Sequence, residues 1–380
     1  MKFSIFLCLL IVFCFFSFHT LISADELITE ELQEIERQEV LMETKSTLNS
    51  LLTSGLREDR DLLELNEILH NVDLLEIVEI TGMTPSELSR FFLPDLFVTV
   101  AGLGLVNILD TMFALGFDIN RLNEDSFTPL ILAARNGKFE AVRFLIDSRA
   151  EIDKADEDGL TPLRYAVLFS HYRIAEYLLT NKARVNQRDR YQWTPLLSAV
   201  TNQDTPMVSL LLNNGADPEL KTRHGEFPLV EAIFHKNEQI VSLLLESRVN
   251  PDVKDVRQNN PALFLAIDNR DKSIAEKLII AGADINARGA QLSDTSLMRA
   301  VKMDLPDIVA MLLSKGAEIN AVDNNGWSAL FYALERGNPQ TIDTLLKHNI
   351  DRAILDKSGK TALDTWNWRL EDHIIELISE

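Results

Sequence analysis

Cysteine is nearly absent from this chain of 380 residues: only Cys8 and Cys14 carry a thiol, and both lie close to the start. If the first residues are removed after synthesis, neither a thiol nor a disulfide remains. A fold without disulfides must be stabilised by its apolar core. The composition supplies that core, because 46% of the residues are hydrophobic.

Basic charge is scarce too. The 37 Lys and Arg residues face 58 Asp and Glu residues, which gives a formal net charge of −21. The imbalance is steepest in residues 25–94, which hold 17 acidic and 5 basic residues. An acidic chain is repelled by phosphate groups, so nucleic acids and anionic membrane surfaces are poor partners for it.

Motifs for catalysis and metal binding are missing as well. The histidines are scattered without metal-ligand spacing, and neither a Gly-x-Ser-x-Gly elbow nor a phosphate loop occurs. Gly102 and Gly104 faintly resemble a dinucleotide loop, but the third glycine position is Asn107 and no strand is predicted before it. We interpret this pair as a helix-packing or turn feature. We therefore predict no enzyme activity, no catalytic residue, no metal and no cofactor.

The N-terminus carries a targeting pattern. Lys2 precedes a run over residues 3–18 that is apolar except for two serines, and small residues follow around Ala24. A positive start, a short apolar run and a small-residue cleavage site predict a secretory signal peptide over residues 1–24, with cleavage near Ala24.

An uncleaved anchor is the alternative, since residues 3–22 approach the length of a membrane span. No second stretch is long and apolar enough to cross a bilayer, so we expect no membrane span after cleavage. The sequence has no Asn-x-Ser/Thr acceptor site, which argues against a eukaryotic secretory route. We therefore expect a periplasmic or secreted protein.

A repeated motif dominates the rest of the chain. The tripeptide Thr-Pro-Leu recurs every 33 residues, at residues 128–130, 161–163 and 194–196, and an alanine follows three residues after each leucine. Degraded copies continue the series at residues 227–229, 261–263, 295–297, 328–330 and 361–363. The alanines are Ala133, Ala166, Ala199, Ala232, Ala266, Ala300 and Ala333, and Trp366 replaces the last. This period predicts a stack of repeated units rather than separate compact domains.

The motif resembles the ankyrin repeat. Second-helix patterns of the form Val-x-x-Leu-Leu support the resemblance at residues 208–212, 241–245 and 309–313, and Gly-Ala-Asp/Glu turns follow two of them. The resemblance covers about 260 residues. It implies an all-α fold: an ankyrin-repeat solenoid of helix-turn-helix repeats with β-turn loop fingers, preceded by an N-terminal helical cap.

This reading divides the chain after the signal peptide into two parts. Residues 25–94 form an acidic helical cap region, and residues 95–380 form the ankyrin-repeat domain. Within that domain a degenerate first repeat, 95–121, precedes eight units over 122–380, the last of them truncated.

Each residue of the motif has an expected role. The threonine hydroxyl caps the first helix, proline occupies its first position, and alanine lets neighbouring helices approach. The Leu-Leu pair of the second helix fills the layer between units. A left-handed residue is expected after each second helix, and this position holds Gly215, Gly282, Gly316, Arg149, Lys182, Arg248 and Asn349.

Capping segments are expected at both ends of the stack, since a solenoid must cover its terminal units. Thr84 and Glu87 form the pattern of a capping box that opens a helix. Upstream, amphipathic spacing predicts a helix that contains Leu62, Leu63, Leu65, Ile68, Leu69 and Leu74. The residues expected to close the other end are Trp366, Trp368, Ile374, Ile375 and Leu377.

The candidate binding site lies on the loops that precede three consecutive first helices. Other loops of this kind are acidic or neutral, as at residues 157–158 and 324–325. These three carry Arg188, Arg190, Tyr191 and Trp193, then Lys221, Arg223 and His224, then Lys254 and Arg257. Because loops of a solenoid lie side by side, we predict a basic, aromatic stripe that binds protein. Trp327, just before a later first helix, is a further candidate.

Other interpretations stay open. The loop tips are simply solvated in one of them, and in another the stripe holds the acidic segment 25–45 of the same chain. A third places the contact surface on the first helices around Arg164, Leu197 and Phe331. The first-helix aromatic residues interpreted as core are Tyr165, Phe264, Phe331 and Tyr332.

The resemblance implies a monomeric scaffold that binds another protein, and the basic stripe suggests an acidic surface on that partner. For an exported member we expect inhibition of, or immunity to, an envelope or secreted enzyme. An accessory factor that supports a periplasmic enzyme, such as an oxidative-stress enzyme, is one alternative. A secreted effector that binds a host protein is another.

Overall fold

The computed structural model describes residues 96–366 and seven isolated residues before them, at positions 46, 47, 50, 63, 65, 84 and 87. The signal peptide predicted over residues 1–24 lies outside the described residues, as do most of the predicted cap region and everything after residue 366. Every secondary-structure element longer than an isolated bridge in the described part is a helix. This confirms the all-α solenoid expected from the period.

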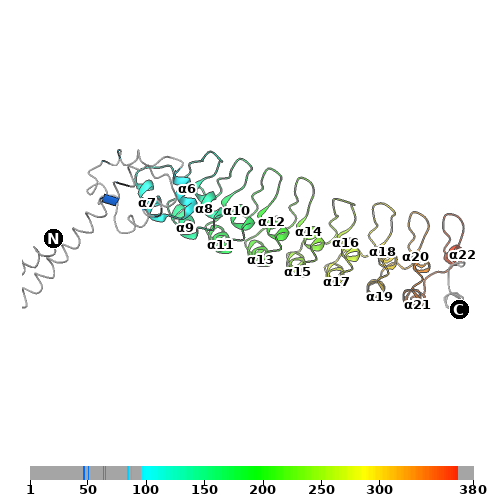
Figure 1. Cartoon of the computed structure of the whole chain (residues 1–380). Helices are drawn as coiled ribbons and strands as arrows, with labels where there is room; N and C mark the ends of the chain where they lie inside the picture. The colour runs from blue at the N-terminus through cyan, green and yellow to red at the C-terminus, as the bar shows by residue number, and fades with distance from the viewer. Residues whose placement is uncertain are drawn as a thin grey trace, which may run out of the picture.

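Helices follow one another in antiparallel pairs. Figure 1 shows the pairs stacked in one direction, with the connecting loops along one edge, the first helices beneath them and the second helices along the opposite edge. The pairs are α6 (Leu96–Leu103) with α7 (Val106–Ala114), α8 (Pro129–Arg135) with α9 (Phe139–Asp147), α10 (Pro162–Leu168) with α11 (Tyr172–Thr180), α12 (Pro195–Thr201) with α13 (Thr205–Asn213), α14 (Pro228–Phe234) with α15 (Glu238–Glu246), α16 (Ala262–Asp268) with α17 (Lys272–Ile280), α18 (Ser296–Lys302) with α19 (Pro306–Ser314) and α20 (Ala329–Arg336) with α21 (Pro339–Lys347). Helix α22 (Ala362–Trp366) follows.

The first helices begin where the repeated motif predicts. The hydroxyl oxygen of Thr194 accepts a hydrogen bond of 3.2 Å from the backbone N–H of Leu197, and Pro195 occupies the first helical position. The same cap forms at Thr128, Thr161 and Thr295. The degraded copies at Phe227 and Pro261 have no side-chain cap, because neither side chain carries an acceptor.

The core lies between the helices of neighbouring units. Every alanine of the repeated series is at most 1% exposed, so the first helices pack closely. In the second helices Leu211, Leu244 and Leu312 are completely buried, whereas the leucine that follows each of them is only partly buried. The expectation for the Leu-Leu pair is therefore half right: the first leucine fills the layer between units, and the second lies at its edge.

Left-handed residues end the second helices as predicted. Gly215, Gly282 and Gly316 have φ values of 82°, 97° and 93°. Arg149, Lys182, Arg248 and Asn349 hold the same conformation at 66°, 72°, 62° and 58°, at a cost of roughly 1 kcal/mol each. The stacking of the units thus holds a backbone that these side chains disfavour.

Hydrogen bonds couple each unit to the next at the turns that follow the second helices. Asn120 Oδ1 accepts from the backbone N–H of Glu151 at 2.8 Å, and Asn186 Oδ1 accepts from that of Asp217 at 2.8 Å. The other residues whose backbone N–H groups donate in this way are Arg184, Asn250, Asp284, Glu318 and Asp351. In each of these bonds the acceptor belongs to the earlier unit, and at one turn Asn186 Nδ2 also donates to the carbonyl of Gly215 in the later unit at 3.1 Å.

The loops before the first helices form a second set of contacts. We call each such loop a finger and name it after the helix that it precedes. The backbone N–H of Arg190 in the α12 finger (187–193) donates to the carbonyl of Asp158 in the α10 finger at 2.9 Å. The N–H of Arg223 in the α14 finger (220–226) donates to the carbonyl of Tyr191 at 2.9 Å. We call these backbone bonds rungs.

The α16 finger (253–260) interrupts this series. Later rungs join Asn324 to Leu292 and Lys357 to Asn325. Within the described part of the chain, no rung joins the α16 finger to the finger on either side of it. The α16 and α18 fingers instead share a side-chain bond, from the N–H of Ala290 to Asn260 Oδ1 at 3.2 Å.

The capping box predicted near the N-terminal end is present among the described residues. Glu87 Oε2 accepts from the Thr84 N–H at 2.8 Å and the Glu87 N–H donates to Thr84 Oγ1 at 3.3 Å, so the capping box is confirmed. Leu65 is buried at 1% exposure, as expected for the apolar face of an amphipathic helix, whereas Leu63, which is predicted for the same helix, is 56% exposed. The other leucine and isoleucine residues predicted for this helix, and the end residues after Trp366, lie outside the described residues.

The two glycines that resemble a dinucleotide loop serve packing and a turn. Gly102 is buried in α6, where a Cβ atom would come within 2.7 Å of the Leu132 side chain. Gly104 ends this helix with a φ of 82°. Over the described ranges, no helix has the length and apolarity needed to cross a membrane.

Candidate functional site

A buried carboxylate shapes the α12 finger from inside. Asp189 Oδ1 accepts the backbone N–H groups of Tyr191 at 2.8 Å and of Trp193 at 2.9 Å. Carboxylates or amides in the same place hold other fingers: Asn123, Asp156, Asp255, Asp323 and Asp356. These residues lie outside the repeated Thr-Pro-Leu motif, although the spacing of 33 residues that reveals the leucines also connects most of them.

The predicted stripe lies on three neighbouring fingers. The members that are exposed are Arg190, Tyr191, Lys221, Arg223, His224, Lys254 and Arg257, while Arg188 and Trp193 are partly buried. The rung from Arg223 to Tyr191 holds the α12 and α14 fingers side by side. The members on the α16 finger continue the row without a rung.

Part of the stripe's positive charge is used within the molecule. Arg190 Nη2 lies 2.6 Å from Asp158 Oδ1, and Arg188 donates to Gln192. The Arg257 guanidinium lies 4.8 Å from the centre of the Phe234 ring. The side chains of Arg223, His224 and Lys254 form no ion pair or ring contact within the described structure, and all three are exposed to solvent.

Trp327 lies apart from the stripe. It is partly buried, and its ring lies 5.6 Å from that of Phe331, 5.3 Å from that of Tyr332 and 6.0 Å from that of Trp366. This cluster joins the last two units. In the structure, Trp327 forms aromatic contacts at the C-terminal end of the described stack.

The first helices offer a different surface from the one suggested around Arg164, Leu197 and Phe331. Leu197 and Phe331 are completely buried, because the residue after the repeated leucine points into the layer between units. They cannot contact a partner, and that part of the expectation is wrong. The more exposed residues come one position later, among them Tyr165, Glu231 and Arg299. Phe264, Phe331 and Tyr332 are core residues, as predicted, whereas Tyr165 is only partly buried.

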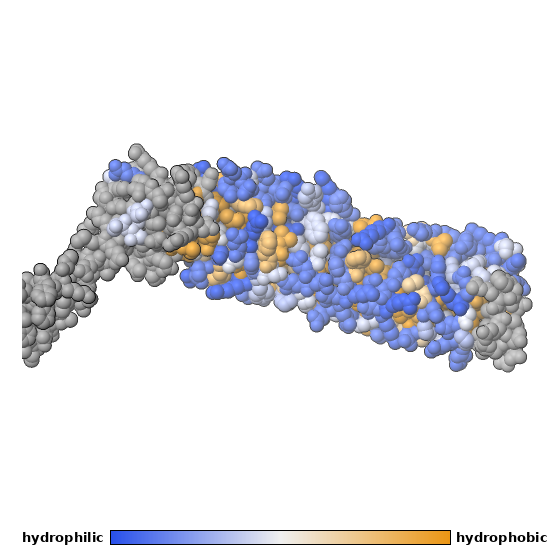
Figure 2. Space-filling model, in the orientation of Figure 1, coloured by the Kyte–Doolittle hydropathy of each residue, from blue (hydrophilic) through white to orange (hydrophobic). Residues whose placement is uncertain are grey.

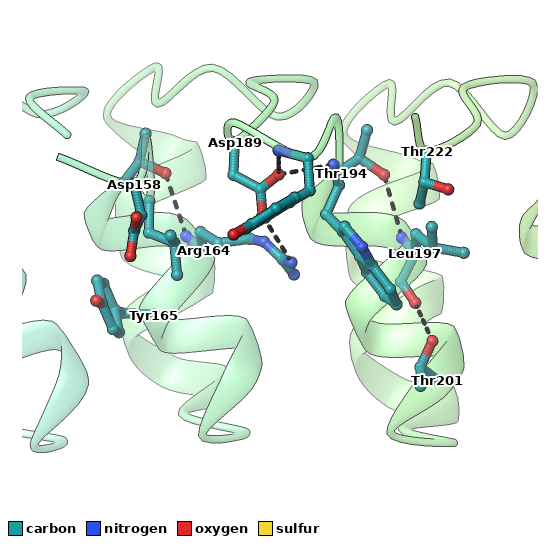
Figure 3. Close-up of polar contacts among 12 residues, drawn as sticks. Asp158, Arg164, Tyr165, Asp189, Thr194, Leu197, Thr201 and Thr222 are labelled. Atoms are coloured by element: carbon teal, nitrogen blue, oxygen red, sulfur yellow. Dashed lines mark hydrogen bonds and ion pairs between the residues drawn. The ribbon is translucent and has the colours of Figure 1, made fainter. Parts of the chain in front are cut away.

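One hollow lies between α10, α12 and the α12 finger. It has a volume of about 330 Å³ and is lined by Arg164 and Leu168, by Asp189, Tyr191 and Trp193, and by Ser198, Thr201 and Asn202. Figure 3 shows the Arg164 side chain extending from α10 toward Asp189 in the space between the two helices. Burial lowers the pKa of the Arg164 guanidinium, and the Asp189 carboxylate partly opposes that shift.

A second hollow has the same construction two units further along. Its volume is about 160 Å³, and its lining includes Val230 and Phe234 of α14, Val256 and Arg257 of the α16 finger and Leu265 of α16. Val230, Phe234 and Arg257 lie 66 residues after Arg164, Leu168 and Tyr191 of the first hollow. Burial raises the pKa of Glu231, which also lines this hollow.

On the face shown in Figure 2, hydrophilic residues predominate and apolar residues form separate patches along the stack. Within the described residues, no group of three or more His, Cys, Asp or Glu side chains is arranged to hold a metal ion.

Comparison with known families decides what this stack is. The profile of the family described as ankyrin repeats, in three copies, matches residues 96–189, 196–289, 252–323 and 297–366. This chain is an ankyrin-repeat protein. Ankyrin repeats act as scaffolds for protein–protein interaction, and stacked repeats create extended surfaces of the kind used for binding.

Individual relatives share parts of this ankyrin-repeat protein. The crystal structure of the ankyrin repeat domain of Bcl-3 superposes with a TM-score of 0.53 at 26% identity, covering 59% of this chain and all of that one. An ankyrin repeat-containing protein of Treponema pallidum is 30% identical over 109 residues, which are 29% of this chain and 36% of that protein. The human NAD-capped RNA hydrolase NUDT12 is 34% identical over 83 residues, or 21% of this chain. The match spans only 17% of the length of NUDT12.

Proposed function

We propose that this ankyrin-repeat protein is exported and binds an acidic surface of one partner protein through the α12, α14 and α16 fingers. The observation that carries the proposal is the group formed by Tyr191 and Arg223 on two fingers that a rung holds together. Both side chains are exposed, and both residue types are enriched in binding hot spots. On a molecule of net charge −21, this basic group steers an acidic surface to one place.

The proposed consequence of binding is inhibition of, or protection against, an envelope or secreted enzyme. A stack of this length covers a wide area of its partner, and a covered enzyme loses access to its substrate. The signal-like sequence before residue 25 supports export. The role assigned to the chain is binding rather than catalysis.

A capture experiment tests this proposal. The full chain, immobilised, is exposed to the cell envelope fraction of its own source, and retained proteins are identified by mass spectrometry. We expect one dominant partner whose enzymatic activity falls when the chain is added. A partner whose activity is unchanged contradicts inhibition, and the absence of any retained protein contradicts the proposal as a whole.

Charge reversal on the fingers tests the site. Arg190→Glu combined with Arg223→Glu is expected to weaken partner binding at least tenfold, about 1.4 kcal/mol, because two steering charges change sign. The melting temperature stays nearly unchanged, since both residues are exposed and the Arg190–Asp158 pair is a surface ion pair. Binding is measured by isothermal titration calorimetry.

The matched control changes the net charge by the same amount elsewhere. Lys272→Glu with Lys315→Glu alters two exposed residues at the start of α17 and the end of α19, away from the fingers. We expect partner affinity within a factor of about two of the unmodified chain. Equal losses in both double variants contradict a local site and leave only the net charge of the molecule as the cause.

A further inference from the structure

Arg164 is an exception within its own row. It is 6% exposed, and it occupies the position directly after the repeated leucine of its unit. The other six complete units place an apolar side chain there: Ile131, Leu197, Val230, Phe264, Met298 and Phe331. The layer between units therefore accepts an apolar residue at this position, and stacking does not require an arginine.

The buried guanidinium is poorly satisfied. Arg164 Nη2 lies 3.6 Å from Asp189 Oδ2, which is an ion pair without a close hydrogen bond. Neither Nε nor Nη1 has a hydrogen-bond partner. The hydroxyl of Ser198, which lines the same hollow, is also buried without a partner. Unsatisfied buried donors are costly in folded proteins and need an explanation other than stability.

We infer that the hollow beside Arg164 is a carboxylate-binding site, which takes an aspartate or glutamate side chain of an extended segment of the partner protein. The inference rests on the proposed function and names what the partner presents. The planar guanidinium matches a carboxylate with two parallel hydrogen bonds, and the Ser198 hydroxyl supplies a third donor. The rings of Tyr191 and Trp193 line the hollow, and the guanidinium carbon of Arg164 lies 5.7 Å from the centre of the Trp193 ring.

The ion pair with Asp189 does not prevent Arg164 from binding a carboxylate of the partner protein. Asp189 Oδ1 is held by the N–H groups of Tyr191 and Trp193, so the finger keeps its shape when the guanidinium turns to a new carboxylate. Unlike a surface arginine, Arg164 discriminates between bound groups, because an uncharged side chain in the hollow leaves its donors unsatisfied.

The second hollow sets the register of the bound segment. Phe234 and Val256 line it and are 46% and 47% exposed, which suits an apolar side chain. Neighbouring helices lie about 8–10 Å apart, so two units separate the hollows by roughly 20 Å. An extended chain covers that distance in about six residues. The segment therefore carries its acidic residue and an apolar residue about six positions apart.

An array of immobilised peptides tests the inference with the full chain. Each peptide has about twelve residues, long enough to reach both hollows, with an acetylated start, an amidated end and a Ser/Thr background. One set varies the residue at a fixed position through Asp, Glu, Asn, Gln and Leu. Another set moves a leucine along the peptide relative to the glutamate. We expect selection of Asp or Glu over Asn or Gln by at least tenfold, and an optimum spacing near six residues.

Three variants separate recognition from stability. Arg164→Leu, which installs the residue of the neighbouring unit, is expected to abolish the acidic preference and to leave the melting temperature unchanged or higher. Arg164→Lys keeps the charge but loses the paired donors, so at least half of the preference is lost. Arg143→Leu, on the exposed side of α9, is the control and retains full preference.

The outcomes discriminate between the two proposals. A lower melting temperature in Arg164→Leu together with unchanged peptide selection shows an ion pair that serves only the fold, and overturns the inference. The absence of acidic selection by the unmodified chain overturns it too. If the array shows no acidic selection while a partner protein is still captured, the proposed function stands, and the partner contacts a surface other than this hollow.

Discussion

At the scale of single residues, the fingers show how a carboxylate is buried with its hydrogen bonds satisfied. Asp323 Oδ1 accepts the backbone N–H groups of Asn325 and Trp327, and its Oδ2 accepts the Tyr332 hydroxyl at 2.7 Å. Asp156 and Tyr165 repeat the contact at 2.7 Å in an earlier unit. Such carboxylates fix the finger to the first helix of the same unit.

Removal of the Tyr332 hydroxyl is expected to change how stability depends on pH. Burial, and then the hydrogen bond to Asp323, raise the pKa of Tyr332 above its ordinary value of 10. The neutral phenol is thus favoured in the folded state. Its contribution is fully present below about pH 10 and is lost as the pH rises toward the folded-state pKa.

We therefore expect Tyr332→Phe to be less stable than the unmodified chain at neutral pH by about 1 kcal/mol, for the lost hydrogen bond. This difference shrinks between about pH 9 and about pH 11, because only the unmodified chain loses stability when this phenol ionises. Urea denaturation at a series of pH values measures it. Tyr172→Phe, an exposed tyrosine of α11, is the control, and a constant difference for Tyr332→Phe contradicts the expectation.

At the scale of helices, stability resides in the layer between neighbouring units. Leu211 of α13 is completely buried, while Leu212 beside it is partly buried. Two chemically identical residues in one helix therefore differ only in their position relative to the adjacent unit. This difference makes them a matched pair.

Truncation of this pair is expected to give unequal losses. Leu211→Ala leaves a cavity in a closed layer and lowers the free energy of unfolding by about 2–5 kcal/mol. Leu212→Ala removes a side chain that already touches solvent, and we expect less than half of that loss. Leu244→Ala should resemble Leu211→Ala, since both leucines are completely buried. A loss below about 1 kcal/mol for Leu211→Ala means that the inferred packing is wrong.

The sequence predicts helix ends better than it predicts contacts between units. A threonine cap and a proline act within three residues, so Thr194 and Pro195 reveal the start of α12 directly. The stripe could be placed on adjacent fingers because the period alone orders them. The apolar residues that other units place at the position of Arg164 indicate a buried site, but the approach of its guanidinium to Asp189 depends on the neighbouring unit and could not be foreseen. The missing rungs of the α16 finger likewise depend on backbone positions in three units.

At the scale of the molecule, rungs join the fingers from α10 to α14 and from α18 to α22, and the α16 finger lies between these two runs without a rung on either side. The N–H groups of Arg190 and Arg223 both donate to the preceding finger. Val256 is the next residue in this series of 33, and no backbone rung forms from it in the described structure. The interruption coincides with the second hollow, which Val256 lines.

Amide hydrogen exchange should detect this break. The amide of Val256 is expected to exchange at least tenfold faster than those of Arg190 and Arg223, because only the latter two are hydrogen-bonded between fingers. Site-resolved exchange by nuclear magnetic resonance provides the comparison. The amide of Asn324, which forms a rung beyond the break, is the control and should be protected. Equal protection at Val256 contradicts a break in the row.

The bonds at the turns, which run from each unit only to the next, also determine how the molecule bears a load. A pull applied to the two ends is carried through every interface in series, so the weakest interface yields while the others hold. Each unit of 33 residues that gives way releases roughly 110 Å of extended chain. A tether of this kind lengthens in steps under tension and shortens again as units restack, so a bound partner stays attached while the distance to it changes.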